Sequence, residues 1–508
     1  MVKKGGLAVN TLISTAGSVS TRLVGMLSMI YISNQIGAEG VGLYQLAMTV
    51  YLMAYMIASA GIITSISKLV AEEISRGWMY RAKKVMTIFL TIGFVMSLFV
   101  TGLAYINAEA LSIMIIKDTR IVSGLRILVL SIPFMTLSAC FKGYFYAIKD
   151  IIKPASAEVF EQFIKLILTV IFLGHFGTSD LVMACVGMSL AITVGEVLSF
   201  LYLGFLYYIS RIKNPKYDET SKGERSLIPK ICSVLLPITA SSYLTAVFVL
   251  LENTLIPMGL REFGLSDVES VSIYGMIKGM VMPLLFFPTA LLSACSTILT
   301  PEISRAQSLR YKGRVESLAA RVLHLTLVLA FFIISTFGIY GKELGLTIYS
   351  NNEVGRLLQI MVFISPFMYI EIVVDGILKG MGEQRKCLNY RIVDAILRIS
   401  MMYLLIPRMG ISGLLITIML SNVISATLHL NRLLTVTTLK IDFTKWILHP
   451  AISALAASIV SKTIVMDRIL ADFNVNIKLM GSIGVATIFY TYCLYILQNV
   501  TKEELSFK

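Results

Sequence analysis

The sequence predicts an all-α membrane protein that crosses the lipid bilayer many times. Of its 508 residues, 56% are hydrophobic and 15% are charged, whereas soluble proteins average about 45–50% apolar and about 25% charged residues. Long apolar stretches recur along the whole chain and are apolar on every side, which is typical of spanning helices and not of spanning strands. This composition excludes a secreted disulfide scaffold, a nucleic-acid-binding domain and an ordinary cytosolic enzyme.

About fourteen stretches approach the length of about 20 residues that a helix needs to cross a bilayer core of about 30 Å. The predicted spans are residues 8–33, 41–66, 85–107, 121–141, 155–176, 181–209, 231–257, 271–300, 322–341, 357–378, 391–407, 411–433, 446–466 and 477–498. The first span follows Lys3 and Lys4, as a signal peptide would. Its length and the lack of a small-residue cleavage site predict that it is retained.

Basic residues are distributed unevenly between the two sides of the predicted spans. The 44 Lys and Arg exceed the 30 Asp and Glu by 14, and 30 of the 44 lie in the connections on the same side as the N-terminus, against nine on the other side. Because basic loops stay in the cytoplasm, both termini of this cell-membrane protein are predicted to be cytoplasmic. Binding of anionic lipid head groups is a further role that these loops allow.

A polar linker divides the chain into two sets of six spans and a final pair. The predicted domains are residues 1–209 (N-lobe), 210–230 (cytoplasmic linker), 231–433 (C-lobe) and 434–508 (C-terminal helix pair with a cytoplasmic tail). Because six is an even number, both sets begin on the same side of the membrane. They are therefore predicted to be parallel repeats related by an axis along the membrane normal.

Two local similarities support the duplication. Residues 131–135 resemble residues 364–368, and residues 73–76 resemble residues 302–305 at nearly the same offset. Parallel six-helix repeats predict two bundles that face each other across a central cleft and rock around a site near mid-membrane. The chain is therefore predicted to have the architecture of a transporter.

Charged residues inside the spans are candidates for the binding site, because a charge at bilayer depth costs at least about 2.5–3.5 kcal/mol. Arg22 lies in span 1 among small and hydroxylated residues such as Ser28, and Lys278 lies in span 8. Two such cations suit an anionic ligand; the alternatives are a salt bridge for Arg22 and snorkelling of Lys278 to the surface. Glu252 and Asn253 in span 7 are candidates to pair with Lys278 or bind a coupling cation, unless they form a solvated helix end.

Three charged pairs occupy i,i+4 positions within the spans: Glu161 with Lys165, Asp394 with Arg398, and Glu371 with Asp375. The two opposite-charge pairs favour intrahelical ion pairs, and their recurrence in both halves indicates a structural role. A functional alternative is that they exchange partners between inward-open and outward-open states. The like-charge pair requires protonation of one acid, a shared cation, or neutralisation by a lysine such as Lys379.

The sequence contains no motif of a known catalytic or metal site. The six cysteines (Cys140, Cys185, Cys232, Cys295, Cys387 and Cys493) have no CxxC spacing, so neither a metal site nor a disulfide framework is predicted. Walker A, GxSxG and HExxH motifs are absent. We therefore expect no enzymatic activity, no cofactor and no coupling to ATP within the chain; an ion gradient, the membrane potential or the substrate gradient would supply the energy.

Two segments carry a resemblance to a known family. Residues 20–25 with 34–44 resemble the opening of the polysaccharide-export branch of the MOP flippase superfamily, and residues 287–305 resemble its span-8 region. Within that branch the chain is most similar to the stage V sporulation protein B group. The resemblance implies a flippase that moves undecaprenyl-pyrophosphate-linked saccharide, for spore cortex peptidoglycan or a related wall polymer, from the inner to the outer leaflet. It also implies a V-shaped pair of lobes, with spans 13 and 14 forming a groove for the lipid tail.

The resemblance also assigns roles to individual residues. Arg22 falls on a cavity arginine of the lipid II flippases, whereas Ser28 replaces a second cavity arginine six residues later. Lys278 matches a basic cavity position approximately. The implied partners are the lipid-linked saccharide and membrane lipids, with no nucleic acid; association with wall-synthesis enzymes and a monomeric state are left open.

Three other functions compete with this hypothesis. A multidrug or organic-cation antiporter of the same superfamily would have about twelve spans and an acidic cleft, which Arg22 and Lys278 argue against. A membrane glycosyltransferase or polymerase would need extracytoplasmic carboxylates, for which Glu262, Asp267 and Glu269 are the candidates. A non-transporting scaffold of a wall-synthesis complex would not need buried cations.

Overall fold

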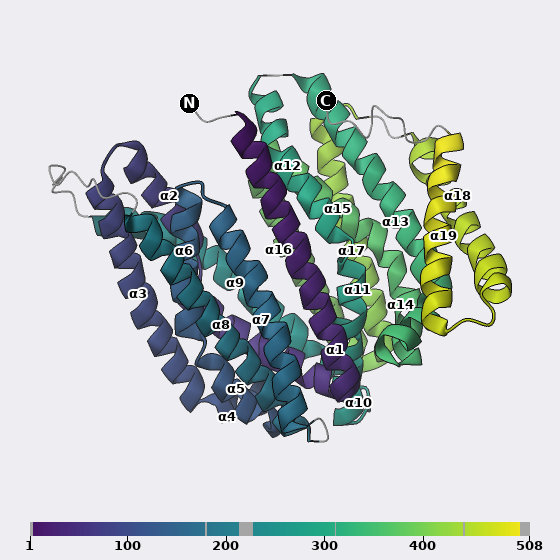
Figure 1. The fold of residues 1–508 in the computed structure, drawn as a ribbon, viewed down its shortest axis with the longest axis horizontal. Helices are drawn as coiled ribbons and strands as arrows, with labels where there is room; N and C mark the ends of the chain where they lie inside the picture. Colours follow the sequence, from purple (N-terminus) through teal and green to yellow (C-terminus); the bar gives the residue numbers. More distant parts are fainter. Residues whose placement is uncertain (1–3, 178–179, 213–226, 310, 440–441, 498–508) are drawn as a thin grey trace. The chain divides into compact units, whose positions relative to one another are not determined.

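The computed structural model describes residues 4–177, 180–212, 227–309, 311–439 and 442–497. The middle of the predicted linker and the end of the predicted C-terminal tail lie outside the described residues. Every regular element within these ranges is a helix (Figure 1), which confirms the all-α class. The chain divides into two compact units, the first made of Met1–Met258 with Ser266–Gly275 and the second of Gly259–Leu265 with Met276–Lys508.

The first unit contains the helices from α1 to α10. They are α1 (Lys4–Ser59), α2 (Ile62–Ser75), α3 (Met79–Ile106), α4 (Ala108–Leu111), the π-helical turn η1 (Ser112–Ile116), the 3-10 turn η2 (Thr119–Ile121), α5 (Val122–Val129), α6 (Ile132–Ala147), α7 (Ile152–Phe176), α8 (Leu181–Ile212), most of α9 (Leu227–Glu262) and α10 (Asp267–Gly275).

The second unit contains the helices that follow. They are the π-helical turn η3 (Met276–Val281), α11 (Met282–Phe286), α12 (Thr289–Ser308), α13 (Lys312–Tyr349), α14 (Asn352–Met361), the 3-10 turn η4 (Val362–Ile364), α15 (Ser365–Gly380), α16 (Gln384–Met409), α17 (Ile411–Val436), η5 (Thr444–Leu448), α18 (His449–Val460), η6 (Ser461–Ile469) and α19 (Val475–Ile496). In the predicted C-terminal pair, α19 packs on α13, where Tyr490 donates a hydrogen bond to the carbonyl oxygen of Val328 at 2.8 Å.

The first unit extends beyond the predicted N-lobe, because α9 and α10 pack on its helices. Thr239 and Tyr243 of α9 donate hydrogen bonds to the carbonyl oxygens of Ala60 and Ile57, at 3.0 and 2.8 Å. The backbones of α1 and α10 also approach closely at Gly42, where an added Cβ would overlap the carbonyl oxygen of Val271. The predicted boundary at residues 210–230 therefore differs from the division into units.

The first two predicted spans are joined in one helix that is broken at a glycine. In α1 the backbone at Gly37 has φ of 67° and ψ of −175°, a conformation that glycine adopts without a side-chain clash. The helix resumes directly, so a break replaces the predicted loop between residues 33 and 41. It ends at Ser59, and α2 starts after Gly61, which also has a positive φ, of 77°.

The predicted number of fourteen spans is not confirmed. Among the described residues, eleven helices are long and apolar enough to cross a membrane, or twelve if α5 and α6, bent by 44°, form one broken span. The continuous segment Thr15–Ser75 counts once, although two spans were predicted there. In α16, the charges of Asp394, Arg398 and Arg408 lie too close together for the segment to pass as an apolar span.

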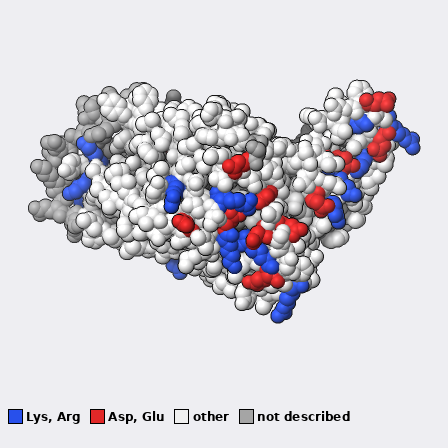
Figure 2. Space-filling model, turned by 90° about the horizontal axis from the view of Figure 1, so that it is seen from below, with Lys and Arg blue, Asp and Glu red and all other residues white. Residues whose placement is uncertain are grey.

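The outward-facing sides of several helices are apolar. On α3, Phe99 and Ile106 are 61% and 76% exposed, and on α19, Met480 and Ile488 are 77% and 70% exposed. Figure 2 shows one face on which charged side chains of both signs gather in clusters beside broad uncharged surface. Apolar surface of this extent marks contact with a membrane, and the chain is a multi-pass membrane protein.

Candidate functional site

A cavity of about 310 Å³ lies inside the first unit, between α1, α6, α7 and α8. Its apolar wall includes Met29 and Met188. Its polar lining includes Ser28 and Tyr51 from α1, Glu161, Gln162 and Lys165 from α7, and Glu196 from α8. The structure therefore brings the predicted residues Ser28, Glu161 and Lys165 together in one site.

The Lys165 ammonium is the centre of the polar side of this cavity. Lys165 Nζ donates hydrogen bonds to Glu161 Oε1 at 2.7 Å and to Glu196 Oε1 at 2.6 Å. Ser199 Oγ donates to the second oxygen of Glu161 at 3.0 Å. The predicted i,i+4 pair is thus formed, and it includes a second carboxylate from the next helix that i,i+4 spacing does not reveal. With two carboxyl groups and one ammonium group, these three side chains have a formal net charge of −1.

The two predicted cavity cations occupy different units and different environments. Arg22 is an exposed residue of α1, three positions before Gly25, which lines the cavity. Residues three apart are neighbours on a helix surface, so Arg22 continues the face of α1 that lines the cavity. Lys278 is half-buried in the π-helical turn η3 of the second unit.

The predicted residues of α9 lie beside α1. Asn253 Nδ2 donates a hydrogen bond to Thr49 Oγ1 at 3.1 Å, and both Glu252 and Asn253 are half-buried. Asn253 therefore helps to hold α9 on the first unit.

The second predicted pair is formed on α16. Arg398 donates to Asp394 Oδ2 at 2.7 Å and, through Nε, to Ser421 Oγ of α17 at 2.8 Å. Ser421 Oγ in turn donates to Asp394 Oδ1. As on α7, the intrahelical pair is extended by a polar side chain of the following helix.

The two acids of the like-charge pair on α15 interact with different groups. Asp375 Oδ2 accepts from Lys379 Nζ at 2.6 Å and from Arg391 at 2.7 Å. Neutralisation by Lys379 is thus the alternative that the structure shows. Glu371 interacts electrostatically with His429 and Arg398 instead.

A fully buried carboxylate, Glu73, joins three helices of the first unit. It pairs with Arg81 Nε of α3 at 3.1 Å and with Lys230 Nζ of α9 at 2.7 Å. Lys230 also reaches Glu72 Oε2 at 2.9 Å. The sequence singles out Glu73 as part of a repeated tetrapeptide, but Arg81 lies on the next helix and Lys230 is 157 residues away, so local spacing does not predict these partners.

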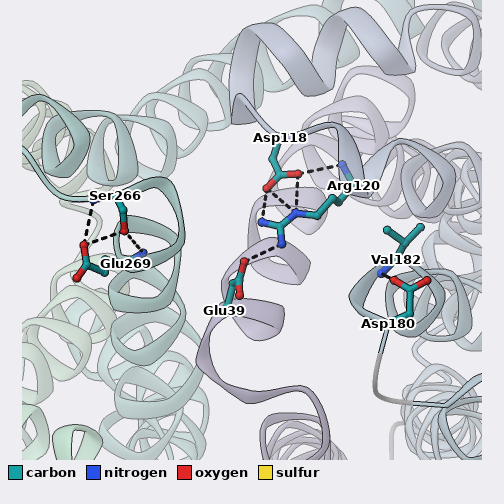
Figure 3. A network of polar contacts seen from close by, with 7 residues as sticks. All are labelled: Glu39, Asp118, Arg120, Asp180, Val182, Ser266 and Glu269. Atoms are coloured by element: carbon teal, nitrogen blue, oxygen red, sulfur yellow. Dashed lines mark hydrogen bonds and ion pairs between the residues drawn. The ribbon is translucent and has the colours of Figure 1, made fainter.

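A charged network ties the segment after the Gly37 break to the turn before α5 (Figure 3). Arg120 NH1 donates to Glu39 Oε1 at 2.7 Å, and its NH2 donates to Asp118 Oδ2 at 2.6 Å.

In the same figure Glu269 Oε2 accepts from the backbone N–H of Ser266 at 3.0 Å, and the Glu269 N–H donates to Ser266 Oγ at 3.2 Å. This is a capping box at the start of α10, which gives Glu269 a structural role and weakens its candidacy as a catalytic carboxylate.

Residues 7–307 match a protein family described as Polysaccharide biosynthesis protein. The chain belongs to this family. The matched segment includes every polar residue of the cavity, Lys278 and Glu73.

Comparison with known proteins supports both the family and the fold. Stage V sporulation protein B of Bacillus subtilis (strain 168) is 25% identical over 499 residues, which are 97% of this chain and 96% of that protein. The structure of lipid II flippase MurJ in an inward closed conformation has a TM-score of 0.72 at 13% identity, covering 96% of this chain and 98% of that one. An inward-facing multidrug resistance MATE family transporter of the MOP superfamily has a TM-score of 0.67 at 14% identity, over 83% and 97%. This member of the polysaccharide biosynthesis family thus has the fold of MOP-superfamily transporters.

Proposed function

We propose that this protein is a flippase that moves undecaprenyl-pyrophosphate-linked saccharide from the inner to the outer leaflet of the cell membrane by alternating access. The substrate would be a precursor of spore cortex peptidoglycan or of a related wall polymer. Membership of the polysaccharide biosynthesis family, the full-length similarity to a sporulation protein and the fold shared with a lipid II flippase support the proposal. The single observation that carries it is a cavity of the first unit whose polar side is centred on the largely enclosed Lys165 ammonium group.

The chemistry of the substrate requires such a cavity. A pyrophosphate carries about two negative charges, which cannot enter hydrocarbon without a large desolvation penalty. Ser28, Gln162 and Lys165 offer hydrogen-bond donors to phosphate and sugar oxygens. The volume of about 310 Å³ is at the lower end of the roughly 300–1,000 Å³ of ligand pockets, so the cavity would admit one part of the head group while the prenyl tail stays in lipid.

An anion that enters the cavity would meet two carboxylates that already bind the ammonium group. Lys165 is held by Glu161 and Glu196, so a pyrophosphate would compete with these carboxylates for the ammonium. We infer that Lys165 exchanges partners during the cycle, and that Asp394 and Arg398 do the same in the second unit. Arg22, on the face of α1 that leads to the cavity, and Lys278 would provide further positive charge, with Glu252 and Asn253 at the boundary of the binding site.

In this proposal both termini are cytoplasmic and the direction of transport is outward. The protein acts as a transporter and not as an enzyme, and it requires no cofactor. Membrane lipids surround it, and enzymes of wall synthesis would supply and consume the saccharide.

An organic-cation antiporter is the second candidate, because Glu161 and Glu196 give the cavity two carboxylates for one ammonium. Native mass spectrometry of the purified full-length protein separates the two functions. Incubation with undecaprenyl-pyrophosphate-linked disaccharide is expected to give a bound species that survives competition by excess tetraphenylphosphonium. Retention of tetraphenylphosphonium with no retention of the lipid-linked saccharide would refute the flippase and support the antiporter.

A further inference from the structure

Three potential metal ligands meet in the second unit, whereas the proposed transport cavity belongs to the first. Asp375 of α15, Cys387 of α16 and His429 of α17 are all buried, and their ligand atoms lie within 4.8 Å of one another. The sequence does not reveal this group because its members come from three separate helices. The inference that follows does not depend on the proposed function.

The histidine is oriented as a metal ligand would be. His429 Nδ1 lies 2.9 Å from the backbone carbonyl oxygen of Ser425. A carbonyl can only accept, so in the neutral ring Nδ1 carries the proton and Nε2 presents a lone pair. Metal-binding histidines are typically fixed in this way, through a hydrogen bond from the other ring nitrogen.

The Nε2 atom of His429 lies near another acceptor. It is 4.0 Å from Asp375 Oδ1. Both atoms are buried, and neither accepts a hydrogen bond from an N–H or O–H group of the described residues; the Cys387 thiol is the donor next to the Asp375 carboxylate. Two buried acceptors that face each other across this distance are unfavourable unless a cation or a proton lies between them.

The neighbouring cations leave this position open. Lys379 and Arg391 both bind Oδ2 of Asp375, the oxygen on the other side of the carboxylate. Their side chains are 39% and 54% exposed, so solvent screens their repulsion of a bound ion. Glu371 also lies close enough to His429 to interact with it electrostatically.

We propose that Asp375, Cys387 and His429 bind a divalent transition-metal ion of the zinc type. Thiolate, imidazole and carboxylate are the ligands that zinc takes in proteins. Zinc–ligand bonds of about 2.0–2.3 Å place the ligand atoms roughly 3.5 Å apart, so on binding the three side chains would move closer than the present separations of up to 4.8 Å. On binding, the Cys387 thiol releases its proton to solvent and the thiolate forms the bond to the metal. The ion would join α15, α16 and α17 and leave a fourth coordination position for water.

The alternative is a protonated His429 that forms an ion pair with Asp375. Cobalt(II) distinguishes the two, because a thiolate bound to cobalt gives a charge-transfer band in the near ultraviolet. The purified full-length protein is stripped with a chelator, loaded with cobalt(II) and examined by absorption spectroscopy, and zinc(II) is then added. The variants are Cys387→Ser, His429→Gln and, as the matched control, Cys493→Ser, which removes a cysteine of the same unit.

The wild type and Cys493→Ser are expected to show the band at an equimolar amount of cobalt and to lose it when zinc is added. Cys387→Ser should lose the band. His429→Gln, which provides an independent test if Cys387→Ser cannot be purified, should bind cobalt at least about tenfold more weakly, because loss of even an outer-shell partner of a metal ligand costs about 10–100-fold in affinity. Absence of the band in the wild type, or an unchanged band in Cys387→Ser or His429→Gln, would overturn the proposal.

Discussion

Lys165 Nζ on α7 lies 2.6 Å from Glu196 Oε1 on α8. The carboxylate is 3% exposed and the lysine side chain 17% exposed, so solvent stabilises neither charge fully. Glu161 completes the group at 2.7 Å from the same nitrogen. One ammonium group therefore compensates the charge of both carboxylates that line the cavity.

Replacement of Lys165 by methionine is expected to destabilise the protein strongly. It leaves Glu161 and Glu196 buried without a cation, and breaking a buried pair in this way costs about 3–5 kcal/mol. Thermal unfolding of the purified protein in detergent measures the effect. The triple variant Glu161→Gln/Lys165→Met/Glu196→Gln removes all three charges and should recover much of the loss. A Lys165→Met protein with wild-type stability would show that the group is not a buried ion pair.

Adjacent glutamates on α2 provide an internal comparison. Glu73 is fully buried and binds Arg81 and Lys230, whereas Glu72 is 35% exposed and binds Lys230 alone. Glu73→Gln is expected to lower the free energy of unfolding by about 3 kcal/mol or more. Glu72→Gln should change it by about 0–1 kcal/mol, as for a surface pair. Equal effects in the two variants would contradict the assignment of Glu73 as the residue that joins α2, α3 and α9.

The close approach of α1 and α10 predicts that Gly42 cannot be replaced. A methyl group at Gly42 would overlap the backbone carbonyl oxygen of Val271, which cannot rotate away. Gly42→Ala should therefore force the helices apart, at a cost of about 1–3 kcal/mol or more, and lower the yield of folded protein. Gly102 of α3 is the matched control, since an added methyl group there meets nothing within 4 Å. Size-exclusion chromatography and thermal unfolding compare the two; a stable Gly42→Ala variant would refute this contact.

The proposed anion-binding role of Arg22 and Lys278 predicts a loss of transport without a loss of folding. Each Ala variant should reduce the flipping rate of lipid-linked saccharide in vesicles at least about tenfold, which corresponds to about 1.4 kcal/mol of lost stabilisation. Arg22→Lys keeps the charge and should retain more activity than Arg22→Ala. Lys312→Ala, at the exposed start of α13, is the control and should flip at the wild-type rate. Wild-type rates in both Arg22→Ala and Lys278→Ala would exclude them from the substrate path.

Local patterns in the sequence were sufficient to predict the helical class and the two intrahelical ion pairs. Spacing of four residues places Lys165 on Glu161 and Arg398 on Asp394 in any helix, and both contacts are formed. Their additional partners, Glu196 and Ser421, lie on the following helices. They depend on how helices pack, which hydropathy does not encode.

Span boundaries were harder to predict because they depend on backbone breaks and on the neighbours of each helix. The break at Gly37 keeps two spans within α1, whereas composition alone indicates a loop. The charges of α16 lower its hydropathy, although Asp394 and Arg398 neutralise each other. Likewise, the group formed by Asp375, Cys387 and His429 joins residues from three helices, and no local spacing predicts it.

The most direct test of the central proposal is the transbilayer movement of undecaprenyl-pyrophosphate-linked disaccharide in vesicles containing the purified wild-type protein. A membrane-impermeant reagent that modifies the exposed head group reports the fraction that it can reach over time. The proposal predicts that almost all of the substrate becomes accessible in vesicles with the protein, whereas the inner-leaflet half stays protected in protein-free vesicles and in vesicles with an unrelated membrane protein. Persistent protection of the inner half in the presence of correctly folded protein would contradict it.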